Sequence, residues 1–265
     1  HPDLLAGRTA LVTGGGSGLG KAIATLLASV GADVTIAARQ ENRLREAAGD
    51  IERAAGRPVG IELVDIRNLE TVDAIAERMG AVDILVNNAG GQFPQKARDF
   101  SPNGWRSVID LNLNGTWNMT QRFGDLMLDS DGGGVICQII ATIGRGIPGI
   151  AHSAAARAGV LELTRTLAYE WGPHVRLNCV APGQFRTDAY TSTYDEGVGD
   201  GYVEQPLPHV GDVTDIANAV TFLVSPAARF ITGEVLYVDG GLTVQGPMSA
   251  LAPGGYPERQ LPRHL

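Results

Sequence analysis

Short stretches rich in β-branched and apolar residues alternate with longer stretches of helical periodicity along almost the whole chain. This alternation is typical of βαβ units, in which helices join parallel strands and pack on both faces of one sheet. We therefore expect an α/β fold, a doubly wound parallel sheet of seven strands that forms a single domain over residues 1–265. The predicted strands are 8–13, 33–37, 59–64, 83–86, 134–140, 175–180 and 234–238, and the predicted helices are 18–30, 41–55, 69–79, 102–112, 114–129, 152–171 and 213–224.

The composition allows a large apolar core and argues against several classes of protein. Hydrophobic residues make up 44% of the chain, and 29 acidic residues outnumber 21 basic ones, for a net charge of −8. Because proteins that neutralise phosphates usually carry the opposite charge balance, we expect no nucleic-acid partner. No apolar run reaches the roughly 18 residues of a membrane span, and the first residues lack the pattern of a signal peptide. We expect no membrane partner and a cytoplasmic location.

The two cysteines of the chain are widely separated. Cys137 and Cys179 lie inside apolar runs, 42 positions apart. This spacing is neither that of a disulfide framework nor that of a metal site. It favours a reducing compartment, and we expect no bound metal.

The first predicted strand ends in a glycine-rich turn that leads directly into the first helix. Glycines let the backbone turn tightly and approach a pyrophosphate, while the helix N-terminus offers free N–H groups and a positive dipole end. Such a turn can also serve only to pack a helix on a strand. Its place in a chain of βαβ units favours dinucleotide binding by Gly14, Gly16, Ser17, Gly18, Leu19 and Gly20.

The end of the second predicted strand indicates which nicotinamide cofactor binds. Enzymes that use NAD place an acidic residue here for the ribose 2′-OH, whereas those that use NADP accommodate the 2′-phosphate with arginine. This chain has Arg39 and no carboxylate before Glu41. Arg39 can form a bidentate contact with phosphate, and an ordinary solvated charge is the alternative. We expect NADP(H) as the cofactor.

Several motifs in sequence order resemble those of the short-chain dehydrogenase/reductase family, and the match covers residues 5–242. The motifs are Thr13–Gly20, Asn87–Gly90, Asn112, Pro182–Gly183 and Asp239–Gly241. The resemblance implies a Rossmann-type fold and a nicotinamide cofactor. It implies cofactor contacts for Asp65 and Ile66 at the adenine, for Asn88, Ala89 and Gly90 in the nucleotide cleft, and for Pro182, Gly183, Phe185 and Thr187 beside the nicotinamide.

The catalytic residues that the resemblance implies are partly replaced in this chain. The family has a serine, a Tyr-x-x-x-Lys pair and an asparagine, which corresponds to Asn112. Ser153 and Arg157 occupy the places of the tyrosine and the lysine, and the serine position falls at Thr142 or the alanine before it. A serine hydroxyl does not titrate near neutral pH, and arginine stays protonated. Ser153 and Arg157 share one helix face, so they can donate hydrogen bonds but cannot act as the usual acid.

Two longer strings resemble a subgroup with the same replacement. Residues 88–93 (NAGGQF) and 151–160 (AHSAAARAGV) are similar to the peroxisomal trans-2-enoyl-CoA reductases and, more distantly, to the 2,4-dienoyl-CoA reductases. The resemblance implies an NADP-dependent oxidoreductase that reduces the 2,3-double bond of an enoyl-CoA-type acyl thioester. Fixed donors would then hold the enolate oxygen. The donor set is Asn112, Thr142, Ser153 and Arg157, the last of which also contacts the cofactor, whereas a catalytic tyrosine of the subgroup is replaced by Leu161.

His152 is a further catalytic candidate because histidine titrates near pH 7. It could protonate the α-carbon or hold the thioester, and a helix-start histidine turned to solvent is the alternative. Two other functions stay open for the chain. One is a dehydrogenase or reductase that acts on another carbonyl or alcohol with an atypical proton donor. The other is a nucleotide-binding relative that has lost catalysis.

Two segments depart from the alternating pattern. Residues 188–211 are rich in glycine and tyrosine and are predicted to form a substrate lid, because long loops inside compact domains are usually functional. Residues 246–265 form a tail rich in proline and glycine. The helix at 213–224 has an apolar face, Ile216, Val220 and Leu223, which suits either the core or a subunit contact. The resemblance implies a homotetramer.

Overall fold

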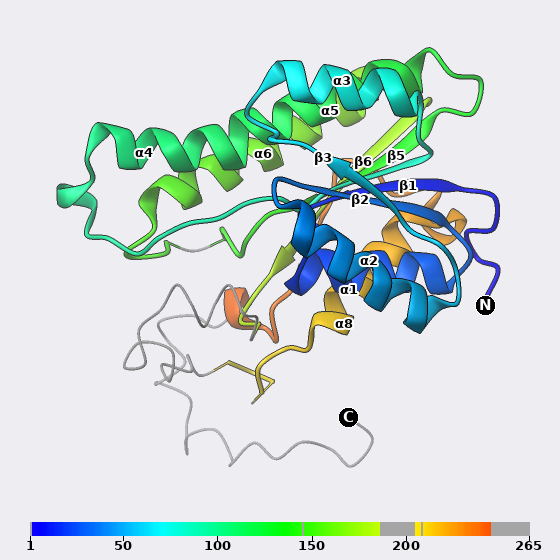
Figure 1. Cartoon of the computed structure of the whole chain (residues 1–265). Helices are drawn as coiled ribbons and strands as arrows, with labels where there is room; N and C mark the ends of the chain where they lie inside the picture. Colours follow the sequence, from blue (N-terminus) through cyan, green and yellow to red (C-terminus); the bar gives the residue numbers. More distant parts are fainter. Residues whose placement is uncertain (1, 145, 186–204, 208, 245–265) are drawn as a thin grey trace.

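The computed structural model describes residues 2–144, 146–185, 205–207 and 209–244. In this part of the chain, seven parallel strands form one sheet in the order β3-β2-β1-β4-β5-β6-β7 (Figure 1). The predicted Rossmann-type, doubly wound α/β fold is therefore confirmed. The strands are β1 (Thr9–Thr13), β2 (Asp33–Ala38), β3 (Gly60–Leu63), β4 (Ile84–Asn87), β5 (Gly134–Ile139), β6 (Val175–Pro182) and β7 (Val235–Val238).

The central strands are mostly apolar and buried because both faces of the sheet are covered. All four residues of β4 are buried, and so are the last four of β1. Continuous apolar runs of this kind are expected of parallel strands that lie between two helical layers.

Helices pack on both faces of the sheet, as Figure 1 shows. One layer contains α1, α2 and α8, and the other contains α3, α5 and α6. Each layer encloses its own apolar core, in which Leu27 and Ile216 represent the first layer and Phe123 the second. The helices are α1 (Gly18–Ser29), α2 (Glu41–Ala55), α3 (Leu69–Met79), α4 (Pro102–Ile109), α5 (Gly115–Leu128), α6 (Ala151–Glu170) and α8 (Val213–Val224).

The direction of the chain across the sheet reverses between β1 and β4. From β1 the chain moves outward through β2 to β3, then returns to pair β4 with the other side of β1 and continues to β7. In open α/β sheets, ligands bind beyond the carboxyl ends of the strands at such a switch point. The glycine-rich turn after β1 and the Asn87–Gly90 motif at the end of β4 both lie there.

The predicted elements agree with the observed ones to within about two residues, apart from the two helices expected at 102–112 and 114–129. The chain does not break between them. Helix α4 continues through a π-helical turn, Asp110–Asn114, directly into α5. The lid expected at 188–211 lies outside the described residues except for 205–207 and 209–211, and the expected tail at 246–265 lies wholly outside them.

Two further expectations concern apolar surfaces. No helix within the described ranges is long and apolar enough to cross a bilayer. In α8, Ile216, Val220 and Leu223 are buried in the core that α8 shares with α1. The suggestion that these three residues form a subunit contact is therefore wrong, because their side chains are already used inside the domain.

Candidate active site

The glycine-rich turn between β1 and α1 has no room for a side chain at Gly14, Gly15 or Gly20. Gly14 has a φ of 68°, and a Cβ there would lie 2.8 Å from Asn88 Nδ2. A Cβ at Gly20 would collide with the carbonyl oxygen of Gly14 and lie 2.5 Å from the same Asn88 nitrogen. Helix α1 is therefore held against the end of β1, so that its N-terminus opens directly onto the turn.

The N-terminus of α1 leaves backbone donors for a ligand. The N-cap residue, Ser17, makes no side-chain capping bond, and the first turn of the helix contains no acidic residue. Free N–H groups and the positive end of the helix dipole together suit an anion. At Gly16 a Cβ would meet nothing closer than 3.7 Å. This cradle fits the pyrophosphate of a dinucleotide, as the sequence predicts for Gly14–Gly20.

Asn88 and Thr13 tie the ends of β1 and β4 together. The Thr13 hydroxyl accepts the backbone N–H groups of Asn88 and Ala89, both at 3.0 Å. The Asn88 side chain donates to the carbonyl oxygens of Thr13 at 3.1 Å and Gly14 at 3.3 Å. Asn88 thus fixes the shape of the turn, a structural role that also positions Ala89 and Gly90 at the crevice.

The edge of the crevice beyond β2 and β3 carries the residues expected at the adenosine end. Arg39 is exposed and makes no ion pair with any described residue. Asp65 forms an ion pair with Arg67 at 2.5 Å, and its pKa lies below the usual value because Arg67 donates to it. The side chain of Ile66 is buried and packs against Gly115, so only the backbone of Ile66 can contact a ligand.

Arg43 also belongs to this end of the crevice, although the sequence did not single it out. The Cβ of Arg43 lies 3.7 Å from the position that a Cβ on Gly16 would take. The nearby carboxylate of Glu41 forms an ion pair with Arg45 and not with Arg43. Arg43 has no ion pair among the described side chains. The available signal was its spacing of four residues from Arg39, at the start of the helix that follows β2.

Asn112 lies in the π-helical turn and is fully buried. Its Nδ2 donates to the carbonyl oxygens of Gly91 at 2.7 Å and Val108 at 3.0 Å, and its Oδ1 accepts the Gly91 N–H at 3.1 Å. Both amide hydrogens are therefore occupied, and Asn112 holds the Gly90–Gly91 backbone rather than offering a free donor. This arrangement differs from the expected donor role.

Arg157 points from α6 toward the same backbone. Its Nη1 donates to the carbonyl oxygen of Ile139 at 2.7 Å, at the end of β5. A Cβ on Gly90 would collide with its Nη2 and lie 2.6 Å from Asn112 Oδ1. Burial lowers the pKa of Arg157 to about 10, which leaves the guanidinium charged at neutral pH. No described carboxylate pairs with it, so the cation is free to meet an anionic or polar ligand.

Ser153 lies one helical turn before Arg157, and Thr142 follows β5. Ser153 is buried, and its hydroxyl makes no hydrogen bond with a described residue. Thr142 is partly buried and also lacks a hydrogen-bond partner in the described ranges. Thr142 lies just beyond the carboxyl end of β5, and Ser153 lies on the same helix face as Arg157, which bonds the carbonyl oxygen of Ile139 there. Two hydroxyl groups therefore remain available as donors there.

His152 is buried between aromatic rings and does not face solvent. Its ring centroid lies 4.7 Å from that of Phe93 and 4.3 Å from that of Phe100. Its Nδ1 accepts the Ser153 N–H at 2.7 Å, which satisfies one free donor at the start of α6. Burial lowers its pKa, so the imidazole is neutral at pH 7. The alternative of a solvent-facing histidine is wrong.

The segment after β6 lies against β7. Pro182 pairs with Val238 in the sheet, and a Cβ on Gly183 would lie 2.5 Å from the Cα of Asp239. Phe185 is buried and forms a bridge with Gly211. These residues leave the sheet at its carboxyl edge, as expected of a segment beside the nicotinamide. Thr187 lies outside the described residues.

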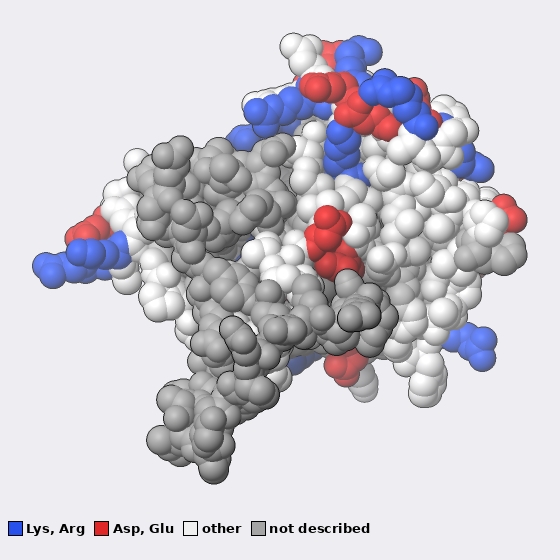
Figure 2. Space-filling model, turned by 90° about the horizontal axis from the view of Figure 1, so that it is seen from below, with Lys and Arg blue, Asp and Glu red and all other residues white. Residues whose placement is uncertain are grey.

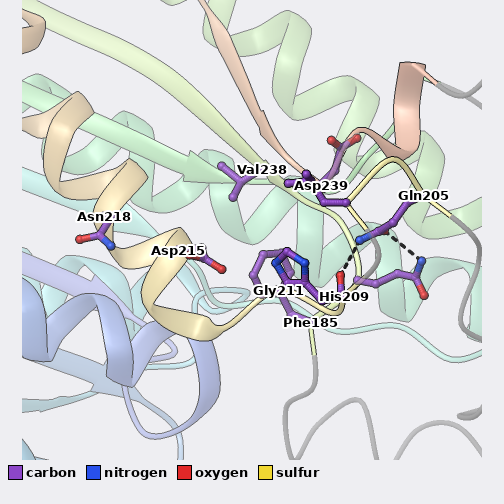
Figure 3. A pocket seen from close by; sticks show the side chains of 11 residues that line it. Phe185, Gln205, His209, Gly211, Asp215, Asn218, Val238 and Asp239 are labelled. Carbon is purple, nitrogen blue, oxygen red and sulfur yellow. Dashed lines mark hydrogen bonds between the residues drawn. The ribbon is translucent and has the colours of Figure 1, made fainter. Parts of the chain in front are cut away.

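A cavity of about 370 Å³ lies beside this segment, between the ends of β6 and β7 and the first turn of α8 (Figure 3). In Figure 3, Gln205 reaches across it to the carbonyl oxygen of His209, at 2.7 Å. None of the expected catalytic residues lines this cavity. Its walls are Gln184, Phe185, Gln205, Leu207, His209, Gly211, Asp215, Asn218, Val238, Asp239 and Gly240.

Comparison with known proteins agrees with this arrangement. The family model described as "Enoyl-(Acyl carrier protein) reductase" matches residues 14–243. The peroxisomal 2,4-dienoyl-CoA reductase [(3E)-enoyl-CoA-producing] of Danio rerio is 39% identical over 250 residues, which cover 91% of this chain and 83% of the relative.

Two solved structures share the fold over nearly their whole length. A short chain dehydrogenase/reductase family protein has a TM-score of 0.83 at 39% identity and covers 91% of this chain and 99% of its own. A gluconate 5-dehydrogenase from Burkholderia cenocepacia, in complex with NADP and tartrate, has a TM-score of 0.84 at 32% identity and covers 92% and 99%. The strand order, the glycine-rich turn and the family match agree: the chain belongs to the short-chain dehydrogenase/reductase family of oxidoreductases, which use a nicotinamide cofactor.

Proposed function

We propose that this chain is an NADPH-dependent reductase of acyl thioesters that carry a conjugated double bond, with the 2,3-double bond of a 2-enoyl-CoA as the bond reduced. The observation that supports it is the donor set at the end of β5. A partly buried arginine, whose pKa burial lowers, and two available hydroxyl groups stand where a carbonyl reductase needs a titratable acid. Such a site can stabilise negative charge but has no acid ready to protonate an alkoxide.

The reduction of a conjugated thioester needs a site that stabilises negative charge on an oxygen, but it needs no acid to protonate an alkoxide. When bound, NADPH supplies a hydride to the β-carbon of the substrate. The charge that develops on the thioester oxygen can be held by Arg157 and by the hydroxyls of Ser153 and Thr142. Because charge-assisted hydrogen bonds are strong in a desolvated site, Arg157 carries the largest share. The α-carbon then takes its proton from water.

A 2,4-dienoyl-CoA is the second candidate substrate, favoured by the name of the Danio rerio relative. That name describes a product with its double bond at carbon 3, so hydride enters at carbon 5 and the proton at carbon 2. The charge still develops on the thioester oxygen, and the same donors would hold it. The two substrates therefore differ in where the acyl chain lies, not in the donor set.

A side-by-side assay tests the proposal. NADPH consumption is followed with crotonyl-CoA, 2,4-hexadienoyl-CoA and acetoacetyl-CoA as substrates. We expect reduction of one or both conjugated thioesters and poor reduction of the 3-oxo compound. Good reduction of acetoacetyl-CoA alone would contradict the proposal, and no consumption with any of the three would favour a relative that has lost catalysis.

The cofactor preference follows from Arg39. We expect NADPH to bind much more tightly than NADH, and Arg39→Ala to remove much of the difference. Losing one charge-assisted contact costs about 1.5–3 kcal/mol, or about 10- to 150-fold in affinity. The measurement is a fluorescence titration with both cofactors. Arg45→Ala is the matched control, because Arg45 is exposed on α2, the helix that follows Arg39, and already pairs with Glu41 at 2.5 Å. Equal affinities in the wild type would contradict the prediction.

We also propose a homotetramer, in which α8 and β7 contact other subunits. Figure 2 shows the face that carries α1, α2 and α8, where charged side chains gather mostly at the edges and the area beside a central acidic group carries few charges. Three large apolar side chains remain exposed: Phe222 on α8, Phe230 in the segment before β7, and Leu236 on the edge strand β7. Exposed apolar side chains near an open sheet edge are typical of subunit interfaces. Light scattering at micromolar protein should give the mass of about four chains, and a monomer would contradict this. The cytoplasmic location stays a prediction.

A further inference from the structure

The loop after β3 is a closed turn that fixes the position of Asp65. The N–H of Asn68 donates to the carbonyl oxygen of Asp65 at 2.8 Å. The Thr71 hydroxyl donates to the same oxygen at 2.9 Å, and it accepts the Asp65 N–H at 3.3 Å. The backbone of Asp65 therefore has little freedom to move, which fixes where its carboxylate starts.

Arg67 occupies both oxygens of that carboxylate. Oδ1 accepts the Arg67 N–H at 3.1 Å and Nε at 2.9 Å, while Oδ2 accepts Nη2 at 2.5 Å. These hydrogen bonds raise the pKa of Arg67, and the charges of Asp65 and Asp110 add to the effect. Arg67 thus compensates a carboxylate at the adenosine end of the crevice, with a second acidic residue close to it.

Arg39 stands close to this pair. Strands β2 and β3 are paired up to Ala38 and Leu63, and the next backbone bond joins Val64 N–H to the Ala38 carbonyl at 3.1 Å. Arg39 and Asp65 then leave adjacent strand ends, and the charge of Arg39 contributes to the low pKa of Asp65. An anion bound by Arg39 would therefore be repelled by Asp65 unless the carboxylate were compensated.

We propose that Arg67 determines the preference for NADPH by neutralising Asp65, so that a 2′-phosphate can bind at Arg39 without repulsion. The inference rests on the proposed use of NADPH and adds a residue that does not itself hold the phosphate. The group of Arg39, Arg43, Asp65 and Arg67 carries a net charge of +2. Without Arg67 the net charge falls to +1, and the Asp65 carboxylate has no ion-pair partner beside it.

The test is a binding titration of the full chain with NADPH and with NADH. Arg67→Gln should weaken NADPH binding about tenfold, since the pair is partly exposed, and change NADH binding by about twofold or less. The double variant Asp65→Asn with Arg67→Gln should recover NADPH affinity to within about threefold of the wild type. A loss that shrinks in high salt would agree with an electrostatic origin.

Arg78→Gln is the matched control. Arg78 forms a comparable ion pair with Glu62 of β3, at 2.6 Å, and it should leave both affinities unchanged. If the wild type shows no preference for NADPH, the cofactor proposal fails, which the first titration alone reveals. If the wild type prefers NADPH and Arg67→Gln keeps the preference, the role of Arg67 is wrong. If the double variant binds NADH as the wild type does but fails to recover NADPH affinity, Arg67 contacts the phosphate directly and the neutralisation mechanism is overturned. Equal losses with both cofactors would show instead that Asp65 contributes through the adenine, and would also overturn it.

Discussion

Replacing Arg157 by methionine should lower the rate of enoyl-CoA reduction by about 10²–10³-fold and weaken NADPH binding as well, because removing one donor to a developing oxyanion costs about 3–4 kcal/mol. Arg157 is charged, desolvated and held by the carbonyl oxygen of Ile139. The Arg157 guanidinium also lies against Gly90, so removing it leaves a gap in the wall of the crevice. Ser153→Ala and Thr142→Ala should lower turnover while leaving NADPH affinity nearly intact.

The matched control for Arg157 is Arg176. Arg176 is a half-buried arginine of β6 that donates to the carbonyl oxygens of Ile231 and Leu223, both at 3.0 Å. Arg176→Met should lower the melting temperature but leave turnover per folded molecule unchanged. Unchanged turnover in Ser153→Ala and Thr142→Ala together would mean that the donor set plays no part in the reaction.

The same donors define the pH dependence of turnover. Ser153 and Thr142 do not titrate in the accessible range, burial keeps His152 neutral, and the pKa of Arg157 is about 10. A base whose pKa is about 10 is charged below that pH and neutral above it. Turnover should therefore be level from about pH 7 to 9 and fall near pH 10. A sharp change near pH 7 would point to a histidine acid instead.

Gly20→Ala is expected to abolish measurable NADPH binding and to destabilise the domain by about 3 kcal/mol, the upper end of overpacking costs. The added Cβ would strike the Gly14 carbonyl oxygen, which is backbone and cannot rotate away. Relief requires α1 to move off β1, and this movement would take the helix N-terminus away from the phosphates. Denaturant unfolding and a cofactor titration measure the two effects.

Gly49→Ala serves as the control for that substitution. Gly49 lies in α2, and a Cβ there would meet only the end of the Arg53 side chain, at 3.6 Å. Alanine favours a helix over glycine, so this variant should be stabilised by about 0.5–1 kcal/mol and bind NADPH normally. If Gly20→Ala behaved like Gly49→Ala, the close packing of the turn would have no role in binding.

The sequence was sufficient to predict what depends on local pattern. The strand and helix periods, the glycines of the turn and the missing acid after β2 are all properties of short segments. What it could not predict depends on residues far apart in the chain. The burial of His152 requires Phe93 and Phe100, which lie 59 and 52 positions earlier, to pack against it.

Asn112 illustrates the same limit at the site itself. Its residue type and position suggested a donor, but whether its hydrogens are free depends on the Gly91 carbonyl and on the π-helical turn. Arg43 was missed for a related reason. A charged side chain in the first turn of a helix is usually solvated. Arg43 lies at the cofactor crevice only because the start of α2 packs close to Gly16.

The π-helical turn also sets the rotational phase between two helices. An α-helix advances about 100° per residue, so the wider turn at Asp110–Asn114 offsets the face of α4 from that of α5. This offset lets Val108 of α4 turn inward while Phe123 of α5 faces the sheet. A π-helical turn accommodates one extra residue, so deleting one residue here would restore a regular helix with little change in the phase of α4, whereas inserting one would rotate α4 by about 100°. An insertion in this short stretch would therefore alter the mouth of the crevice without touching a residue that contacts the substrate.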